Sequence, residues 1–483
     1  MQEDIIMSKI RYTILLLVAC VLFVGGASAQ TAKSAYFLEG AFHNYQLNPA
    51  MQAERPFFSA ALGNWALKTN GNFGLSNFLY PYGDNQLTTF MSSSVSADEF
   101  LGRLPQSLQL STELGSTLFA AGFRLLGGYT TFSLTMNSTS SFNMPRGFFE
   151  FAKKGFQEDH YSFSGINVNT MNYAALTLGY SHQIVEGLRV GVNAKYLVGL
   201  AYANLHVDKL NIQMNEDKWM VETHASAEAA FYTEVSVDAG PMDDLNEPRV
   251  PMVDAFENME TINYSNVMSA LKPAARGFAF DLGVEYDMES IIKGLTVSAS
   301  LVDVGGINWK YVTKASLKDS KVEFDGIDEI DPNDFEGSIE KEVEAIAADL
   351  EEMFAVPYCH GTTSGTTKLS PVMYLGAEYE MPFYRPLSFA VLYGKRFAAY
   401  GGWDEVRGYC NIAPLKWLEF SANAAYSTYG TSWGWMFNFH PKLFSFFVGS
   451  DFMITKVTPQ YIPVNNMNGH ITIGINKPLG KRK

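Results

Sequence analysis

The stretch FAFDLGVEYD, residues 278–287, alternates apolar with small or acidic residues along its whole length. One face of an extended chain would collect the large apolar side chains of Phe278, Phe280, Leu282, Val284 and Tyr286. The other face would collect Ala279, Asp281, Gly283, Glu285 and Asp287. Successive side chains of a β-strand point to opposite faces, so the pattern predicts a strand with one apolar face. A strand of a soluble sandwich would share this pattern.

The same alternation recurs in GLRVGVNAKYLVG (187–199), WLEFSANAAYS (417–427) and GHITIGIN (469–476). Aromatic residues such as Trp417 and Phe444 lie near the ends of these segments, and aromatic residues make up 14% of the chain. Alternating segments of about ten residues with aromatic flanks are typical of outer-membrane barrels. We therefore predict an all-β fold, a transmembrane antiparallel barrel of about 14 strands, within a range of roughly 14 to 18.

The first residues resemble an export signal. Lys9 and Arg11 precede an apolar run over residues 14–24, and small residues follow it. This run is shorter than the roughly 20 residues that a membrane-spanning helix needs, so we predict a signal peptide over residues 1–29. The expected organisation continues with an N-terminal plug or hatch segment (30–54) and a barrel (55–483). External insertions are expected at about 233–275 and 319–368, because long connections of such barrels face outward.

Composition narrows the classes of partner. The formal net charge is −15, and removal of the signal peptide leaves it unchanged, so nucleic acid is not an expected partner. Cys359 stands beside His360 without the spacing of a zinc site, and Cys359 and Cys410 could form a disulfide or remain free thiols. The aspartates of the second insertion do not follow the EF-hand spacing. We predict no metal site, cofactor or catalytic residue.

The polar faces of the alternating strands supply the candidate lumen residues, because barrel interiors are polar. These are Arg189, Asn193, Lys195, Asp281, Glu285, Glu378 and Glu419. They could line a path for a ligand, or they could simply pair with one another across the lumen. A remote alternative is a membrane-embedded lipid hydrolase built from Asn438, His440 and Ser445, although no nucleophile-elbow motif accompanies these residues.

Asn48, Pro49 and Ala50 stand before the first expected strand, in YQLNPAMQAERP. Asn is a good helix cap and Pro suits the first position of a helical turn. The triplet therefore predicts a local turn. It either belongs to a segment folded back into the lumen as a plug or leads directly into the first strand.

The order of signal peptide, LNPA, the glycine-rich GNFGLSNFLYP and repeated barrel strands resembles an outer-membrane barrel family of unknown function common in Bacteroidetes. More distantly, the chain resembles FadL-type fatty-acid transporters and PorV-like barrels of type IX secretion. FadL-type proteins carry an Asn-Pro-Ala motif in their N-terminal hatch, which matches Asn48, Pro49 and Ala50. The strand style of GLRVGVNAKY and GLTVSAS supports the same likeness.

This resemblance implies an outer-membrane location and a channel or carrier for small hydrophobic molecules. The large insertions favour an alternative, a scaffold that holds surface or secretion proteins. The expected partners are therefore outer-membrane lipid and either a hydrophobic small molecule or such proteins.

Overall fold

The computed structural model describes residues 32–53, 55–82, 86–154, 160–214, 219–230, 275–324, 358–453 and 468–480. The predicted signal peptide lies outside the described residues. Most residues of the two predicted insertions also lie outside the described residues. Strands extend into the second insertion, however, because one strand runs to Phe324 and the next begins at Tyr358.

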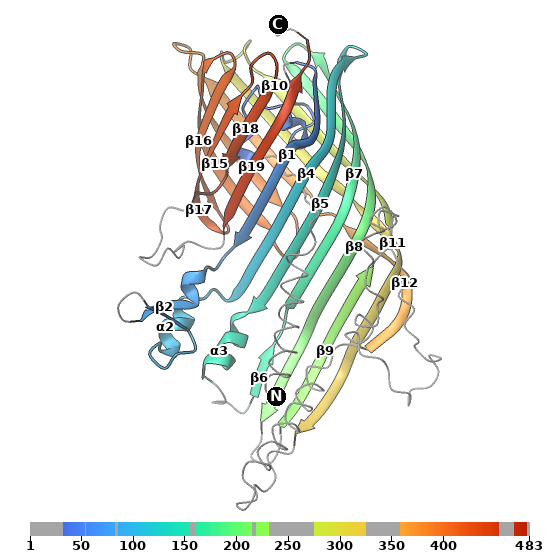
Figure 1. The fold of residues 1–483 in the computed structure, drawn as a ribbon, viewed down its shortest axis with the longest axis vertical. Coiled ribbons are helices and arrows are strands. Elements are labelled where there is room, and N and C mark those ends of the chain that lie inside the picture. Colours follow the sequence, from blue (N-terminus) through green and yellow to red (C-terminus); the bar gives the residue numbers. More distant parts are fainter. Residues whose placement is uncertain are drawn as a thin grey trace, which may run out of the picture.

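A single antiparallel sheet closes on itself (Figure 1), since β1 (Phe57–Gly71) pairs with both β4 (Ser107–Leu125) and β19 (Gly469–Pro478). The wall continues from β4 through β5 (Gly128–Pro145), β7 (Ile166–Val185), β8 (Leu188–Met214), β10 (Ala275–Asp287) and β11 (Leu295–Phe324). It then passes through β13 (Val372–Glu380), β14 (Leu387–Arg396), β15 (Trp403–Leu415), β16 (Leu418–Ser427), β17 (Gly430–Phe439) and β18 (Ser445–Ser450) to β19. This closed barrel of 14 strands confirms the predicted fold.

Three shorter strands lengthen the wall on one side. β6 (His160–Phe163) pairs with β8 beyond the start of β7. β9 (Trp219–Ala230) pairs with β8 and β11 beyond β10, and β12 (Tyr358–Lys368) pairs with β11 beyond β13. The barrel wall is therefore taller along β8 and β11 than along the strands near the C-terminus.

The two ends of the barrel differ in their connections. At one end, short turns join neighbouring strands, over residues 126–127, 186–187, 288–294, 381–386, 416–417 and 440–444. We call this the turn end; in Figure 1 it is the upper end, next to the C-terminus. The opposite end, which we call the loop end, carries the long connections.

A small aromatic subdomain projects at the loop end. It contains η3 (Leu75–Asn77), β2 (Leu79–Tyr82), β3 (Gln86–Thr89), α2 (Ala97–Gly102) and α3 (Arg146–Lys154). Phe90 stacks on Phe100 with ring centroids 4.3 Å apart, and both rings pack near Phe78. The Ser96 hydroxyl caps α2 by accepting a hydrogen bond from the Glu99 N–H at 3.1 Å.

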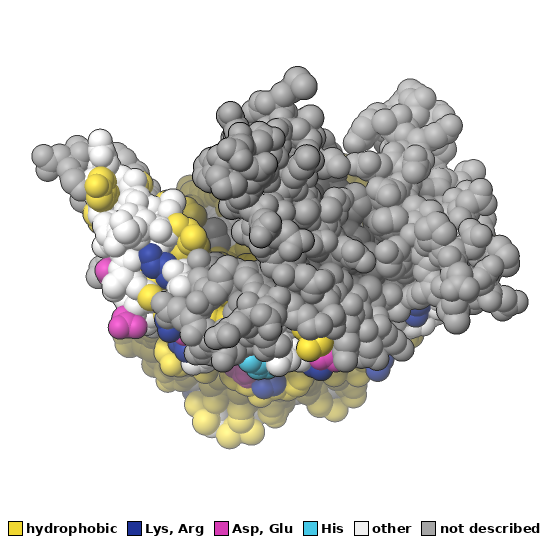
Figure 2. All heavy atoms as spheres, turned by 90° about the horizontal axis from the view of Figure 1, so that it is seen from below, with side chains coloured by type: hydrophobic (Ala, Val, Ile, Leu, Met, Phe, Trp, Pro, Cys, Tyr) yellow, Lys and Arg dark blue, Asp and Glu magenta, His cyan; other side chains and the backbone are white. Residues whose placement is uncertain are grey.

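The outer surface of the barrel is apolar. Large hydrophobic side chains are exposed there on strands from all around the wall, including Phe278, Leu282, Val391, Phe420 and Ile471. Figure 2, seen from the loop end, shows such side chains along the barrel's outer side, with charged groups nearer the viewer. An apolar band around a closed barrel is the surface that a bilayer covers. Among the described residues, no helix is long and apolar enough to cross a membrane.

Candidate functional site

The N-terminal segment, residues 32–53, lies inside the turn-end half of the barrel. It contains two short helical turns, η1 (Lys33–Ala35) and η2 (Asn44–Gln46). Its apolar side chains are buried against the wall, among them Tyr36, Leu38, Phe42, Tyr45 and Leu47. Hydrogen bonds join it to strands on opposite sides of the ring: Ser300 on β11 donates to the Leu47 carbonyl at 2.7 Å, and His43 Nε2 lies 2.8 Å from Asn476 Oδ1 on β19. A segment bonded to opposite parts of the wall must cross the lumen.

The predicted turn at Asn48, Pro49 and Ala50 rests on two glycines of the wall. Asn48 Oδ1 accepts from the Ala50 N–H at 3.0 Å, and its Nδ2 donates to the Val284 carbonyl at 3.2 Å. Gly191 of β8 and Gly283 of β10 are register partners directly beneath the turn. A Cβ on Gly191 would overlap the Pro49 carbonyl, and one on Gly283 would overlap Asn48 Oδ1. The close approach therefore requires glycine at both positions.

A buried ionic cluster holds the start of the segment. Lys33 Nζ lies 2.6 Å from Glu405 Oε2, and Arg407 Nε lies 2.9 Å from Glu405 Oε1. Asp451 accepts from the Lys33 and Ser34 backbone N–H groups at 3.1 and 2.8 Å. Arg407 and Asp451 are each about fully buried, at 0% and 1% exposure. Two carboxylates thus face two cations in a buried site, which makes the loss of one partner costly.

Burial also shifts the titratable groups of the segment itself. It lowers the pKa of Lys33 to about 8, with the attraction of Glu405 opposing that effect. It lowers the pKa of His43 to about 4, and the His43 Nε2 atom lies 2.8 Å from Asn476 Oδ1. His43 is therefore neutral at pH 7 and acts as a hydrogen-bonding group in the packed segment.

Five of the predicted lumen residues lie together on β8 and β10. Arg189 pairs with its register partner Glu285 at 2.7 Å. Asn193 donates to the Tyr45 carbonyl at 3.2 Å and to Asp281 Oδ2 at 2.8 Å. Lys195 Nζ lies 2.8 Å from Asp281 Oδ1. These charges pair with neighbours along the wall rather than across the lumen.

The other two predicted lumen residues lie apart from this group. Glu378 of β13 accepts from the Ser388 hydroxyl at 2.6 Å. Glu419 of β16 accepts from the Gly40 N–H at 3.0 Å and from Asn438 Nδ2 at 2.8 Å.

Asn438, His440 and Ser445, the residues of the remote hydrolase alternative, are all buried at 1% exposure or less. Arg55 also contacts the turn over residues 440–444, because its side chain donates a hydrogen bond to the His440 carbonyl at 3.0 Å.

On the loop-end side of the segment, the lumen contains a cavity of about 550 Å³. Tyr45, Gln46 and Leu47 of the N-terminal segment line it on the turn-end side. Its volume falls within the roughly 300–1,000 Å³ of typical small-molecule sites. The N-terminal segment thus forms the turn-end wall of this cavity.

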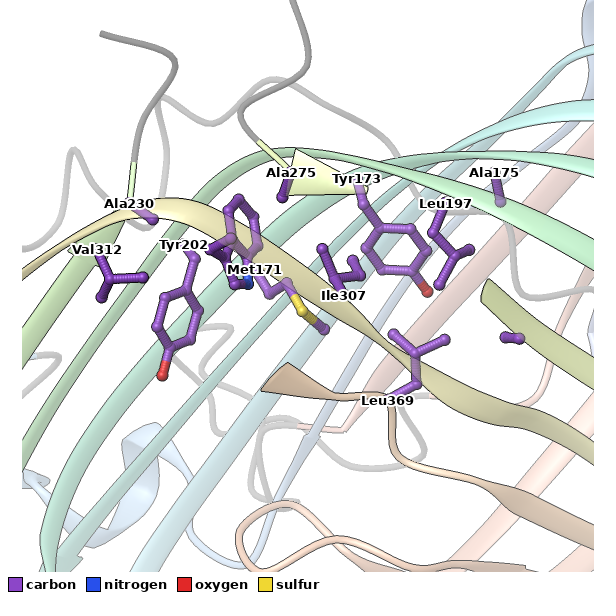
Figure 3. Close-up of a cluster of buried hydrophobic side chains, with 12 residues drawn as sticks. Met171, Tyr173, Ala175, Leu197, Tyr202, Ala230, Ala275, Ile307, Val312 and Leu369 are labelled. Carbon is purple, nitrogen blue, oxygen red and sulfur yellow. The ribbon is translucent and has the colours of Figure 1, made fainter. Parts of the chain in front are cut away.

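The cavity wall has two distinct surfaces. β5 contributes a polar ladder of uncharged side chains: Ser133, Thr135, Asn137, Thr139 and Ser141. The neighbouring strands and the residue after β12 contribute an apolar shelf: Met171, Tyr173, Tyr202 and Leu369. Figure 3 shows the four shelf side chains pointing into one common space. Trp309 supports the shelf from behind, stacked on Tyr202 at 5.6 Å.

Asp303 is a charged cavity residue that the sequence analysis did not select. Residues 302 and 303 of β11 lie opposite Asp281 alone, which makes a β-bulge, and Asp303 has a φ of +62°. Its carboxylate lies 2.6 Å from Lys195 Nζ, and its N–H donates to Asp281 Oδ1 at 2.8 Å. Local alternation gives no sign of a bulge, so no sequence signal identified this residue.

Within the described residues, no group of three or more His, Cys, Asp or Glu side chains is arranged to hold a metal ion. Cys410, on the exposed face of β15, has no disulfide partner among the described side chains. The side chain of Cys359 lies outside the described part of the chain, so both alternatives, a disulfide and two free thiols, stay predictions.

A closed barrel with an apolar outer band and a polar, internally filled lumen defines an outer-membrane type of β-barrel protein. Within that class, the chain belongs to the "Family of unknown function (DUF5723)", whose model matches residues 49–451. This match confirms the predicted membership of a family of unknown function. No curated protein matches the sequence.

Solved structures of FadL-type outer-membrane proteins are similar over most of the chain. The toluene transporter TbuX of Ralstonia pickettii gives a TM-score of 0.40 at 8% identity, covering 91% of this chain and 93% of that one. A Pseudomonas aeruginosa FadL homologue gives 0.40 at 9% identity, covering 94% and 100%. The toluene transporter TodX of P. putida gives 0.38 at 8% identity, covering 94% and 96%. Likenesses this distant do not identify a ligand.

Proposed function

We propose that this protein is an outer-membrane channel or carrier for small hydrophobic molecules. The observation that carries the proposal is the cavity of about 550 Å³ between the N-terminal segment and the barrel wall. Its apolar shelf offers a surface for a hydrophobic body, and its volume suits a small molecule. In this account the N-terminal segment blocks the turn-end half of the lumen until it is displaced.

The arrangement of the ends supports an orientation in the membrane. Bacterial barrels have short periplasmic turns and longer external loops. The turn end therefore faces the periplasm, and the cavity lies on the external side of the N-terminal segment. A ligand would reach the cavity first and pass the N-terminal segment afterwards.

Uptake of radiolabelled toluene tests the proposal, in cells that express the wild-type protein or the Gly191→Leu variant. Leucine at position 191 would occupy the place of the Pro49 carbonyl and unseat the turn, so faster uptake is expected. Gly408→Leu is the matched control, because a Cβ there meets no other atom within 4 Å. Equal uptake by the two variants, at equal amounts of folded protein in the membrane, would contradict a blocking role.

The alternative functions have weaker support. The three residues of the hydrolase alternative are buried near the turn end of the barrel, and Asn438 is hydrogen-bonded to Glu419. The scaffold alternative depends on the two insertions, which fall largely outside the described residues. We therefore propose transport alone.

A further inference from the structure

The connection between β14 and β15, residues 397–402, folds into the lumen, and its tip at Gly401 is buried. A Cβ on Gly401 would lie 3.2 Å from the Cβ of Ser111 on β4 and 3.8 Å from the Cβ of Ser141 on β5. In the closed ring of strands, β4 and β5 stand opposite β14 and β15. The connection, which we call the crossing loop, therefore spans the lumen.

The base of the crossing loop is firmly held. Arg396, the last residue of β14, forms an ion pair across the lumen with buried Glu113 of β4. Separating a buried pair of opposite charges is costly, so this contact fixes the base. The Phe397 N–H also donates to the Pro371 carbonyl at 2.9 Å, on the loop's own side of the barrel.

The tip of the crossing loop has weaker contacts than its base. Among the described residues, no hydrogen bond joins residues 398–401 to the opposite wall. Gly401 has a φ of +70°, which glycine adopts without strain. The tip therefore touches β4 and β5 through van der Waals contacts, which are individually weak. Its displacement would break no hydrogen bond and would leave the ion pair at the base intact.

The crossing loop also borders the cavity. Ala398, Ala399 and Tyr400 line it, and they belong to a loop-end connection, whereas the N-terminal segment lines the turn-end side. The Tyr400 ring reaches toward β8, where its centroid lies 6.2 Å from that of the His206 ring. A molecule that approaches the cavity from the loop end thus meets Tyr400 between the crossing loop and β8.

We propose that the crossing loop is the external gate of the cavity, that it opens when its tip leaves β4 and β5, and that Tyr400 limits the size of the molecules admitted. This inference rests on the proposed function, because it describes how a hydrophobic molecule enters the cavity. It assigns entry to residues 398–401 and the later step, passage to the periplasm, to the N-terminal segment.

A disulfide between the tip and β5 tests the gate in cells that express the full chain. The variant carries Gly401→Cys and Ser141→Cys, with Cys359 and Cys410 replaced by serine. The 3.8 Å between the two Cβ positions matches the mean of about 3.8 Å in natural disulfides. After oxidation, uptake of radiolabelled toluene should fall to the level of cells without the protein, and reduction should restore it.

The matched control is Ser111→Cys with Ser141→Cys in the same background. These two serines are register partners on adjacent strands, so a disulfide between them ties β4 to β5 and leaves the crossing loop free. Toluene uptake should be the same before and after oxidation. Gly401→Cys alone accounts for any strain at this position and should behave like the reduced double variant.

Tyr400→Ala tests the size limit. Removal of the ring should raise the uptake of pyrene relative to that of toluene by about tenfold, because even one methylene group in a hydrophobic site is worth a factor of that order. Phe397→Ala is the control, since Phe397 is an exposed aromatic residue of the same loop that does not line the cavity. An unchanged ratio in Tyr400→Ala would show that Tyr400 does not limit entry.

The outcomes separate this inference from the proposed function. If wild-type cells take up toluene no faster than cells without the protein, the proposed function is wrong and the gate with it. If they take it up faster, and the oxidised double variant is as fast as the reduced one, transport stands and the gate is wrong. Thiols at positions 401 and 141 that react with a maleimide but do not form the disulfide would also overturn the gate, because the tip would then lie away from β5.

Discussion

The two halves of the lumen are built differently. In the turn-end half, the wall packs against the chain's own N-terminal segment. Charges there form ion pairs such as Lys33 with Glu405. In the loop-end half, the wall beside the cavity is mostly uncharged and divided into the polar ladder and the apolar shelf. Paired charges specify one permanent partner, whereas uncharged hydrogen-bonding groups leave room for an exchangeable one. This contrast is the reason that we propose a ligand site in the loop-end half.

The largest expected effect comes from breaking the turn-end cluster with Asp451→Ala. Lys33 and Ser34 would lose their acceptor, and the buried Arg407 would lose a nearby negative charge, so unfolding should become easier by about 3–5 kcal/mol. Denaturant titration of the protein in lipid vesicles measures this change.

Asp404→Ala is the control for that variant. Asp404 is half exposed and pairs with exposed Lys395 at 3.0 Å, so its loss should change the free energy of unfolding by less than about 1 kcal/mol. Similar losses for the two variants would mean that the turn-end cluster is not a buried anchor.

A second expected effect concerns the surface that encloses both halves. Leu282 is exposed on the apolar band, at 58%, so Leu282→Arg should destabilise the membrane-inserted barrel by about 2–4 kcal/mol if it lies near the midplane. Unfolding from lipid vesicles measures the difference, with Leu282→Ala to account for lost side-chain contacts. An arginine variant as stable as the alanine variant would argue against lipid contact at this position.

The smallest expected effect lies at the border between the halves, at the bulge residue Asp303. Its φ of +62° strains most L-residues but not glycine. Asp303→Ala should therefore be less stable than Asp303→Gly by about 1 kcal/mol, although both lose the carboxylate. Equal stabilities in the same unfolding assay would show that the bulge relaxes when the carboxylate is removed.

Much of the fold was predictable because each strand carries its own alternation. The pattern at 278–287 placed Asp281 and Glu285 on the face opposite Phe278, and the structure shows Asp281 buried and Phe278 exposed at 63%. The cap of α2 was likewise local, since Ser96 and Glu99 are three residues apart. Local spacing is sufficient for features of this kind.

The site was less predictable because its contacts join distant parts of the chain. Ser34 and Asp451 are separated by 417 residues, and no periodic pattern reports that pairing. Asp303 was missed for a different reason. Strict alternation would place it on the face opposite Ser298 and Ser300, and only the bulge turns it toward Lys195.

The central claim is that the N-terminal segment fills the turn-end half of the lumen in the native membrane. Gln46 Nε2 lies 3.3 Å from Thr117 Oγ1 on β4, which defines a direct test. In intact outer membranes, a Gln46→Cys and Thr117→Cys variant that also carries Cys410→Ser should be linked rapidly by a short bifunctional thiol reagent, and mass spectrometry of the digested protein should recover the joined peptides. Failure to link, with both thiols reactive toward a small maleimide, would show that the segment lies elsewhere and would contradict the account.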